Sequence, residues 1–307
     1  MLFLGAGFSA SARLSLGDAV RDDAIASVIN RDPGSEDLLE AFRRWVLDQP
    51  TRLMNGEAGL RPAEFAARLT LERVLREEFR DLREEGRPRA DSPFIARLSR
   101  DCETALDRWP EARLALHELA DLMPKLVVLM VNFDELVERD APVDVEVFTP
   151  GDDFAGAADA VTRRMTDGGG RLPAVKLHGT IADPETLVAD ITVTRLGLPD
   201  AAVAVLDALV TAGAPRTTLV FIGCSMRDVD VNEWLRNQNG GVDLFEWWVD
   251  PLPGTSFESF VEANRRTDEE ERVVDFVAER LLTETADAFL TALRDHVKAL
   301  RSRAAGA

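Results

Sequence analysis

Asn132 and Asp134 are polar residues whose place in the sequence suits catalysis or ligand binding. They directly follow the apolar run 126–131. We expect that run to be a strand covered on both faces, so that the two side chains lie at its carboxyl end, where open α/β sheets bind ligands. Asn and Asp also cap helices well, so a capping role is the alternative for both residues.

His178 is the residue best suited to proton transfer. It belongs to the stretch KLHG at 176–179, which follows a strand candidate and ends in a glycine. An ordinary histidine pKa of about 6.5 suits a general base near neutrality. A histidine hydrogen-bonded in a turn is the alternative. The other two histidines, His117 and His296, lie in stretches with helical hydrophobic spacing, where we expect surface or flanking positions.

Two glycine turns complete the set. GAGFSA at 5–10 fits the pattern G-x-G-x-x-G/A between a strand and a helix, where backbone N–H groups and the helix dipole favour a pyrophosphate. GCSMRD at 223–228 follows another strand candidate, and there Ser225 would donate to a ribose or phosphate oxygen. A plain turn is the alternative for both. A dehydrogenase places an acidic residue at the end of a second strand about 20 residues after its first turn, and here that region has a helical pattern, which argues against that class.

The elements that would position these residues alternate between strand and helix. Strand candidates are 1–4, 126–131, 143–148, 174–177, 217–222 and 244–249, with helix candidates at 201–211 and 229–237. This alternation predicts an α/β fold with a doubly wound, mostly parallel Rossmann-like sheet. We expect a core formed by 1–30 and 123–302, an inserted helical subdomain at 31–122, and a disordered tail at 303–307.

The composition limits the classes of function. The chain has 307 residues and a net charge of −19, so we expect no direct contact with nucleic acid. No apolar run approaches the roughly 20 residues of a membrane span and no signal peptide is recognisable, which predicts a cytoplasmic protein. The two cysteines, Cys102 and Cys224, cannot build a disulfide framework or a four-cysteine zinc site, and we expect no metal.

The motifs GAGFS, NFD, KLHG and GCSMRD, in this order, resemble those of sirtuin-like NAD-consuming domains. The resemblance covers the core strands but not the stretch 31–122. It implies an NAD site at the strand ends, beside the helical subdomain. The implied roles are phosphate contacts for Gly5, Ala6, Gly7 and Ser9, nicotinamide and ribose contacts for Asn132 and Asp134, catalysis for His178, and adenosine-side contacts for Gly223, Ser225 and Asp228.

Two departures from the family pattern narrow the implied activity. Protein-deacylating sirtuins share a zinc module with four cysteines, and this chain has two cysteines. The deacylases also continue their first motif with G-[IV]-P-D-F-R, whereas the aligned residues 13–18 read RLSLGD. The resemblance therefore implies the bacterial antiphage-defence branch, whose members hydrolyse NAD to nicotinamide and ADP-ribose as abortive-infection effectors.

Three other functions stay open. They are a non-catalytic NAD or ADP-ribose sensor or assembly module, an ADP-ribosyl transferase or residual deacylase, and an interaction protein with an inactive pocket. A freely active NAD hydrolase would be toxic to its host. We therefore expect control by assembly, as a homo-oligomer or through a regulatory partner such as a HerA-type ATPase.

Overall fold

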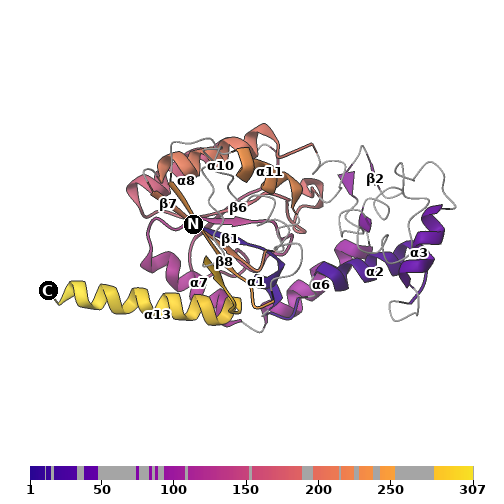
Figure 1. The fold of residues 1–307 in the computed structure, drawn as a ribbon, viewed down its shortest axis with the longest axis horizontal. Helices are drawn as coiled ribbons and strands as arrows, with labels where there is room; N and C mark the ends of the chain where they lie inside the picture. The colour runs from indigo at the N-terminus through magenta and orange to yellow at the C-terminus, as the bar shows by residue number, and fades with distance from the viewer. Residues whose placement is uncertain are drawn as a thin grey trace, which may run out of the picture.

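The computed structural model describes residues 1–10, 12–14, 17–32, 38–47, 74–75, 83–84, 87–88, 93–107, 110–151, 154–188, 196–213, 216–224, 228–237, 243–252 and 280–306. Its centre is a seven-stranded sheet (Figure 1). The strands are β1 (Leu2–Leu4), β4 (Val128–Met130), β5 (Val145–Phe148), β6 (Leu172–Lys176), β7 (Arg216–Ile222), β8 (Asp243–Val249) and β9 (Leu281–Leu282). All their pairings are parallel, which confirms the α/β, Rossmann-like prediction.

The strand order β5-β6-β4-β1-β7-β8-β9 reverses direction at β1. The chain goes from β1 to β4 on one side of it and later crosses to β7 on the other. Leu4 pairs with Met130 of β4 and with Ile222 of β7, so these three strands end level with one another. Such a switch point opens a crevice outside the carboxyl ends of the strands, and the polar motifs follow these ends.

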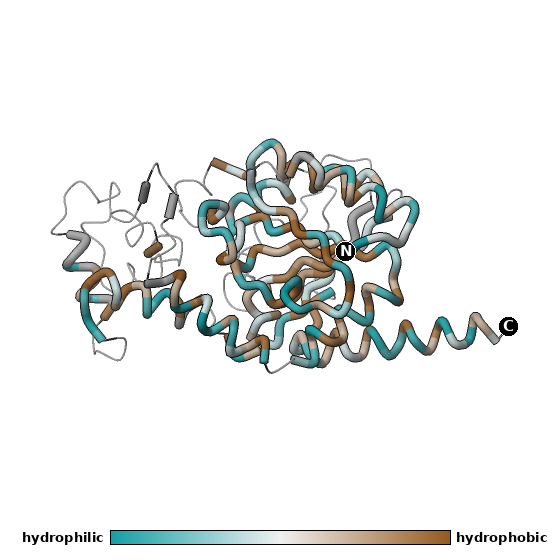
Figure 2. Tube along the Cα trace, turned by 180° about the vertical axis from the view of Figure 1, so that it is seen from behind, coloured by the Kyte–Doolittle hydropathy of each residue, from teal (hydrophilic) through white to brown (hydrophobic). Residues whose placement is uncertain are grey.

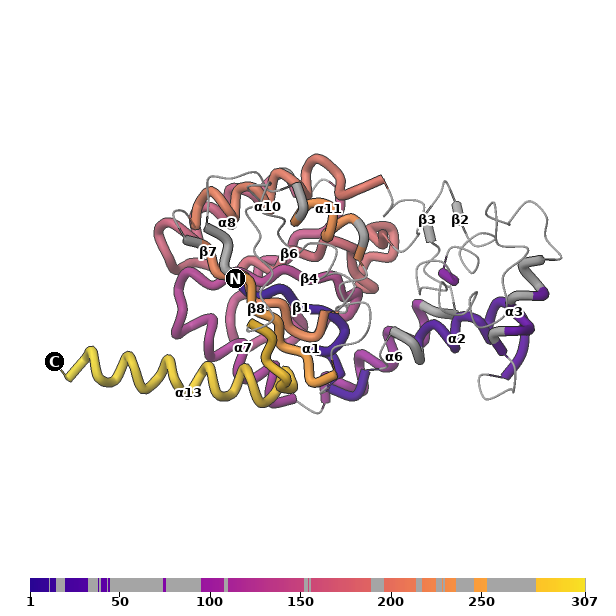
Figure 3. Tube along the Cα trace, in the orientation of Figure 1, coloured from indigo at the N-terminus to yellow at the C-terminus, as the bar shows by residue number. Residues whose placement is uncertain are grey.

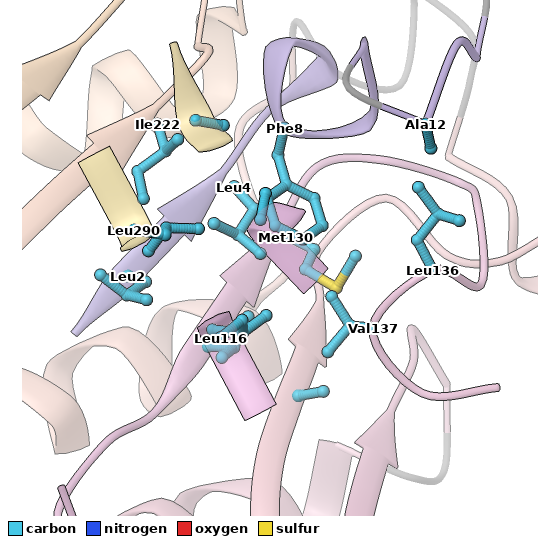
Figure 4. Close-up of a cluster of buried hydrophobic side chains, with 14 of the residues drawn as sticks. Leu2, Leu4, Phe8, Ala12, Leu116, Met130, Leu136, Val137, Ile222 and Leu290 are labelled. Atoms are coloured by element: carbon cyan, nitrogen blue, oxygen red, sulfur yellow. The ribbon is translucent and has the colours of Figure 1, made fainter. Parts of the chain in front are cut away.

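Each face of the sheet is covered by helices because successive strand residues point to opposite faces. Phe3 packs with α8 (Phe154–Asp167), α10 (Asp200–Ala212) and α11 (Val229–Asn237). Leu2 and Leu4 pack on the other side with α1 (Ala6–Ala10), the end of α6 (Pro93–Leu106), α7 (Glu111–Leu122) and α13 (Ala286–Ala305). Figure 4 shows Phe8 of α1, Leu116 of α7 and Leu290 of α13 around the two leucines. The hydropathy of the chain follows these layers, with apolar strands between helices of mixed polarity (Figure 2).

Residues 17–29, which we assigned to the core, join the inserted stretch in a helical lobe with a small apolar cluster of its own. Helices α2 (Gly17–Ile29) and α3 (Leu38–Leu47) lie away from the sheet, and α6 leads back from them (Figure 3). Ile25, Phe42 and Ile95 are buried in this cluster, and Phe133 from the sheet core packs against it. A two-stranded antiparallel pair, β2 (Arg83–Glu84) with β3 (Arg87–Pro88), lies within the stretch that was expected to be helical.

Two further expectations about boundaries need correction. Helix α7, which we assigned to the insertion, packs against α13 and the sheet. The tail expected to be disordered from residue 303 is helical as far as Ala305. The physical reason is local: alanine and arginine are strong helix formers, and Gly306 follows them where the helix ends. In the described part of the chain, no helix is both long and apolar enough to cross a membrane.

The two glycine turns pack backbone against backbone at the switch point. The N–H of Gly5 donates to the Ile222 carbonyl at 3.0 Å, and the N–H of Gly7 donates to the Gly223 carbonyl at 3.0 Å. Gly223 has a φ of +63°, and a Cβ there would lie 2.3 Å from the Cα of Gly7. Neither turn could carry a side chain at these contacts. Glycine is therefore required at these positions by the packing of the two turns, independently of any ligand.

We predict that Gly223→Ala destabilises the protein more than Gly169→Ala does. Both glycines have positive φ, but a Cβ at Gly169 would meet nothing within 4 Å. Gly169→Ala should cost about 1 kcal/mol of unfolding free energy from backbone strain alone. Gly223→Ala should cost roughly a further 1–3 kcal/mol because the turns must move apart. Denaturant unfolding measures both, and equal losses would contradict the interlocking of the turns.

Candidate functional site

Ser9, Asn132 and Asp134 form a buried hydrogen-bonded cluster between α1 and the segment that follows β4. The amide Nδ2 of Asn132 donates to the Gly5 carbonyl at 2.8 Å and to Ser9 Oγ at 3.0 Å. Ser9 Oγ in turn donates to Asp134 Oδ2 at 2.7 Å. Each of the three is at most 8% exposed. The structure thus brings together three residues that the sequence analysis singled out from distant motifs.

The alternative role as helix caps does not apply to Asn132 and Asp134. Residues 131–144, all of which the structure describes, form turns and bends rather than a helix. Asp134 Oδ1 accepts the N–H of Leu136 at 3.1 Å, which closes a local turn. These side chains shape the segment 132–138 and hold it against α1.

Lys176 holds the segment 132–138 from the neighbouring strand β6. It is the last residue of β6, is fully buried, and donates through Nζ to the main-chain oxygen of Asp134 and to Glu138 Oε1, the latter at 2.6 Å. Burial raises the pKa of Glu138, and the Lys176 ammonium opposes that rise. A buried ammonium needs such partners. The ion pair therefore ties the end of one strand to the loop that leaves its neighbour.

His178 lies at the end of β6 in a second polar cluster, formed with α11. Its Nε2 is 3.0 Å from Asp230 Oδ2, and its Nδ1 is 3.8 Å from Asp228 Oδ1. His178 is 4% exposed and Asp230 is 2% exposed, whereas the Asp228 side chain is 21% exposed. The following residue, Gly179, has a φ of +84°, and a Cβ there would lie 2.2 Å from the Thr186 carbonyl oxygen. The turn that presents the imidazole therefore requires glycine.

The two clusters lie on the same edge of the sheet. Met130 pairs with Lys176, and the N–H of Leu177 donates to the Met130 carbonyl at 2.8 Å. Asn132 and His178 each follow that pair by two residues, so they hold equivalent positions beyond neighbouring parallel strands. The loops that follow also join, because the Ile181 N–H donates to the Phe133 carbonyl at 2.9 Å.

In the first glycine turn, the N–H groups of Gly5 and Gly7 are used in hydrogen bonds within the protein. The N–H groups of Gly5 and Gly7 are already donated to the β7–α11 turn, while Ala6, the first residue of α1, is exposed. The space that a Cβ would fill at Gly5 or Gly7 is taken by Gly223 and Cys224. The phosphate role expected for these residues stays a prediction, and Ser9 Oγ contacts Asn132 and Asp134.

The second turn is described in part. Ser225 lies outside the described residues. Asp228, expected on the adenosine side, lies beside His178. Cys224 is buried behind Gly5, and burial raises the pKa of its thiol well above the ordinary value, which does not suit a nucleophile. Among the described residues, no group of three or more His, Cys, Asp or Glu side chains is placed to hold a metal ion.

Sequence reasoning did not single out Asp230, Lys176 or Glu138 as site residues. The sequence did contain an indication for Lys176, since a lysine that ends an otherwise apolar strand must find a buried partner. The sequence contained almost no indication for Asp230, because acidic residues are common in the first turn of a helix.

His117 also differs from expectation. It is buried, with Nε2 2.8 Å from the Val137 carbonyl oxygen, because α7 packs under the 132–138 segment. Burial lowers its pKa. His296 is exposed on α13, as expected.

We predict that Lys176→Met destabilises the protein, and more at pH 8 than at pH 5. Removing one partner of a buried ion pair costs about 3–5 kcal/mol. Without the ammonium, burial holds the folded-state pKa of Glu138 above its unfolded value. Stability from such a group is present below the unfolded pKa and is lost as pH rises through the folded pKa. Denaturant unfolding at both pH values measures the difference.

The control for this prediction is the double variant Lys176→Met/Glu138→Gln. It has no carboxylate to titrate at residue 138, so the additional loss at pH 8 should disappear. A deficit in Lys176→Met that is the same at both pH values would show that the ion pair does not hold the segment as described.

The comparison with protein families agrees with this architecture. Residues 127–251 match the family model of the SIR2-like domain, a range that runs from β4 to β8 and contains Asn132, His178 and Asp230. No curated protein matches the chain. A SIR2-like domain implies an activity related to NAD. Residues 127–251 are thus similar to the SIR2-like domain, and the parallel sheet agrees with that likeness.

Proposed function

We propose that this protein is an NAD⁺ glycohydrolase, which cleaves the nicotinamide–ribose bond and releases nicotinamide and ADP-ribose. The observation that carries the proposal is the pairing of His178 with two carboxylates on the edge of the sheet that also carries the Asn132 cluster. A histidine held in this way is equipped to accept a proton. The SIR2-like domain supplies the expectation of NAD as substrate.

The chemistry of the available groups fits NAD. Its ribose hydroxyls are donors, and the site offers acceptors in the imidazole of His178 and the partly exposed carboxylate of Asp228. Its pyrophosphate would approach the first glycine turn at Ala6, which is exposed where α1 begins. Asn132 donates both contacts of its Nδ2 within the protein, so it would meet a ligand through Oδ1, as an acceptor.

Cleavage of the nicotinamide–ribose bond develops positive charge at C1′ of the ribose, as in glycoside hydrolysis. The Asp134 carboxylate would stabilise this charge. Asn132 would orient the nicotinamide carboxamide or the attacking water through Oδ1. His178 would take the proton from a ribose hydroxyl or from water. General-base catalysis of this kind is worth about 10²–10⁴-fold in rate.

The biological role that we propose is antiphage defence by depletion of NAD in an infected cell. It rests on the departures from the deacylase pattern at residues 13–18 and on the chain having two cysteines. Such an activity must be restrained in a healthy cell. We therefore propose control by self-assembly or by a second protein, for which a HerA-type ATPase is a candidate.

We predict that His178→Ala and Asn132→Ala abolish loss of NAD while leaving the protein folded. The His178 variant should lose about 10²–10⁴-fold in kcat, because it lacks the base. His296→Ala is the matched control, since His296 is exposed on α13 and lies outside both polar clusters. The measurement follows nicotinamide and ADP-ribose in purified protein, alone and with the proteins encoded beside it.

The same measurement separates the alternatives. Binding of NAD without release of nicotinamide, under every condition, would identify a sensor instead of a hydrolase. Transfer of label from NAD to protein would identify a transferase. Full turnover by a folded His178→Ala protein would refute the catalytic assignment.

A further inference from the structure

We propose that Asp230 is a positioning residue that holds His178 in the Nε2–H tautomer, so that Nδ1 is the nitrogen that accepts the proton. The catalytic meaning of this inference rests on the proposed function, but the tautomer itself does not. The residue lies outside the four motifs that resemble those of the family, which end at Asp228.

The chemistry of the contact fixes the direction of the hydrogen bond. Asp230 Oδ2 lies 3.0 Å from Nε2 of His178, and an ionised carboxylate can only accept. Nε2 therefore carries hydrogen and donates it. A neutral imidazole has one N–H group, so its lone pair for a proton is on Nδ1.

The carboxylate of Asp230 is itself held in place. It lies in the first turn of α11, where the helix dipole favours negative charge, and its Oδ1 accepts the N–H of Val231 at 2.9 Å. Helix α11 is anchored in turn, since Trp234 Nε1 donates to Asp207 Oδ1 at 3.0 Å. With Asp230 2% exposed, water competes little for the contact with His178.

Two carboxylates thus face the imidazole, Asp230 from α11 and Asp228 from the position just before that helix, and they would act at different stages of the proton transfer. When Nδ1 takes a proton from a ribose hydroxyl or water, the O–H bond breaks and an Nδ1–H bond forms, while the Nε2–H proton stays on the ring. Asp230 then pairs with an imidazolium and does not itself take the proton. Asp228, 3.8 Å from Nδ1, stabilises the positive charge from the other side. Lys176, two residues before His178, donates to Asp134 and Glu138 rather than to the imidazole.

The tautomer is directly measurable, because the chain has three histidines. Their ¹⁵N chemical shifts in the intact protein at pH 8, without NAD, distinguish Nδ1–H from Nε2–H, and His178→Ala assigns the signal. We expect Nε2–H in the wild-type protein. In Asp230→Asn the amide can donate as well as accept, so we expect the signal to move toward the Nδ1–H tautomer.

Activity gives the second readout. Loss of the same kind of carboxylate in the Ser-His-Asp triad lowers kcat by about 10⁴-fold through the wrong tautomer. We expect Asp230→Asn to lose at least about 10²-fold in kcat with KM little changed. Asp207→Asn is the matched control, since it weakens the anchoring of α11 without touching His178. It should keep the wild-type tautomer.

The tautomer of His178 and the turnover of NAD are measured independently, so the role of Asp230 and the hydrolase activity can fail separately. An Nδ1–H tautomer or a persistent imidazolium in the wild-type protein at pH 8 would overturn the role of Asp230, whether or not Asp230→Asn folds. A tautomer unchanged in folded Asp230→Asn would overturn it as well. The expected tautomer shift in a protein that never consumes NAD would support the positioning role of Asp230 and contradict the hydrolase.

Discussion

The close backbone contact between the two glycine turns is the constraint on which the rest of the site depends. Gly7 and Gly223 approach so closely that neither tolerates a Cβ, and the Gly7 N–H donates across the contact. This contact joins the β1–α1 unit to the β7–α11 unit. Ser9 on α1 and Asp230 on α11 are thereby fixed relative to each other, and each then holds one of the proposed catalytic residues.

The site is divided between the two faces of the sheet. Asn132 is held by α1, which packs on one face, and His178 is held by α11, which packs on the other. Parallel register brings the two residues to one edge although their supports lie on opposite layers. In the mechanism that we propose, one cluster would stabilise the developing positive charge and the other would take the proton, without the carboxylate of Asp134 competing for the imidazole.

The strands and the residues at their ends were predictable because each has a local signal. A continuous apolar run followed by a polar residue, as before Asn132, marks a buried parallel strand and its carboxyl end. Asp230 was not predictable, since its role comes from a contact with His178 across 52 residues of sequence. His117 was misjudged because helical spacing shows an apolar stripe but not how far the flanks of the helix are covered. Packing of α7 under the 132–138 segment decided its burial.

The control by assembly or by a partner that we propose would act on the segment 132–138. Asn132 and Asp134 face α1, Lys176 holds the segment from the sheet, and His117 holds it from α7. Phe133, between the two site residues, packs against the apolar clusters of both the sheet and the helical lobe. A displacement of the lobe would therefore reach Asn132 through its neighbour in the chain. A core of this kind does not deform gradually, because close packing makes rearrangement discrete. Assembly through the helical lobe is thus a physically direct way to switch the site, whereas a partner bound at α13 would have to act through α7.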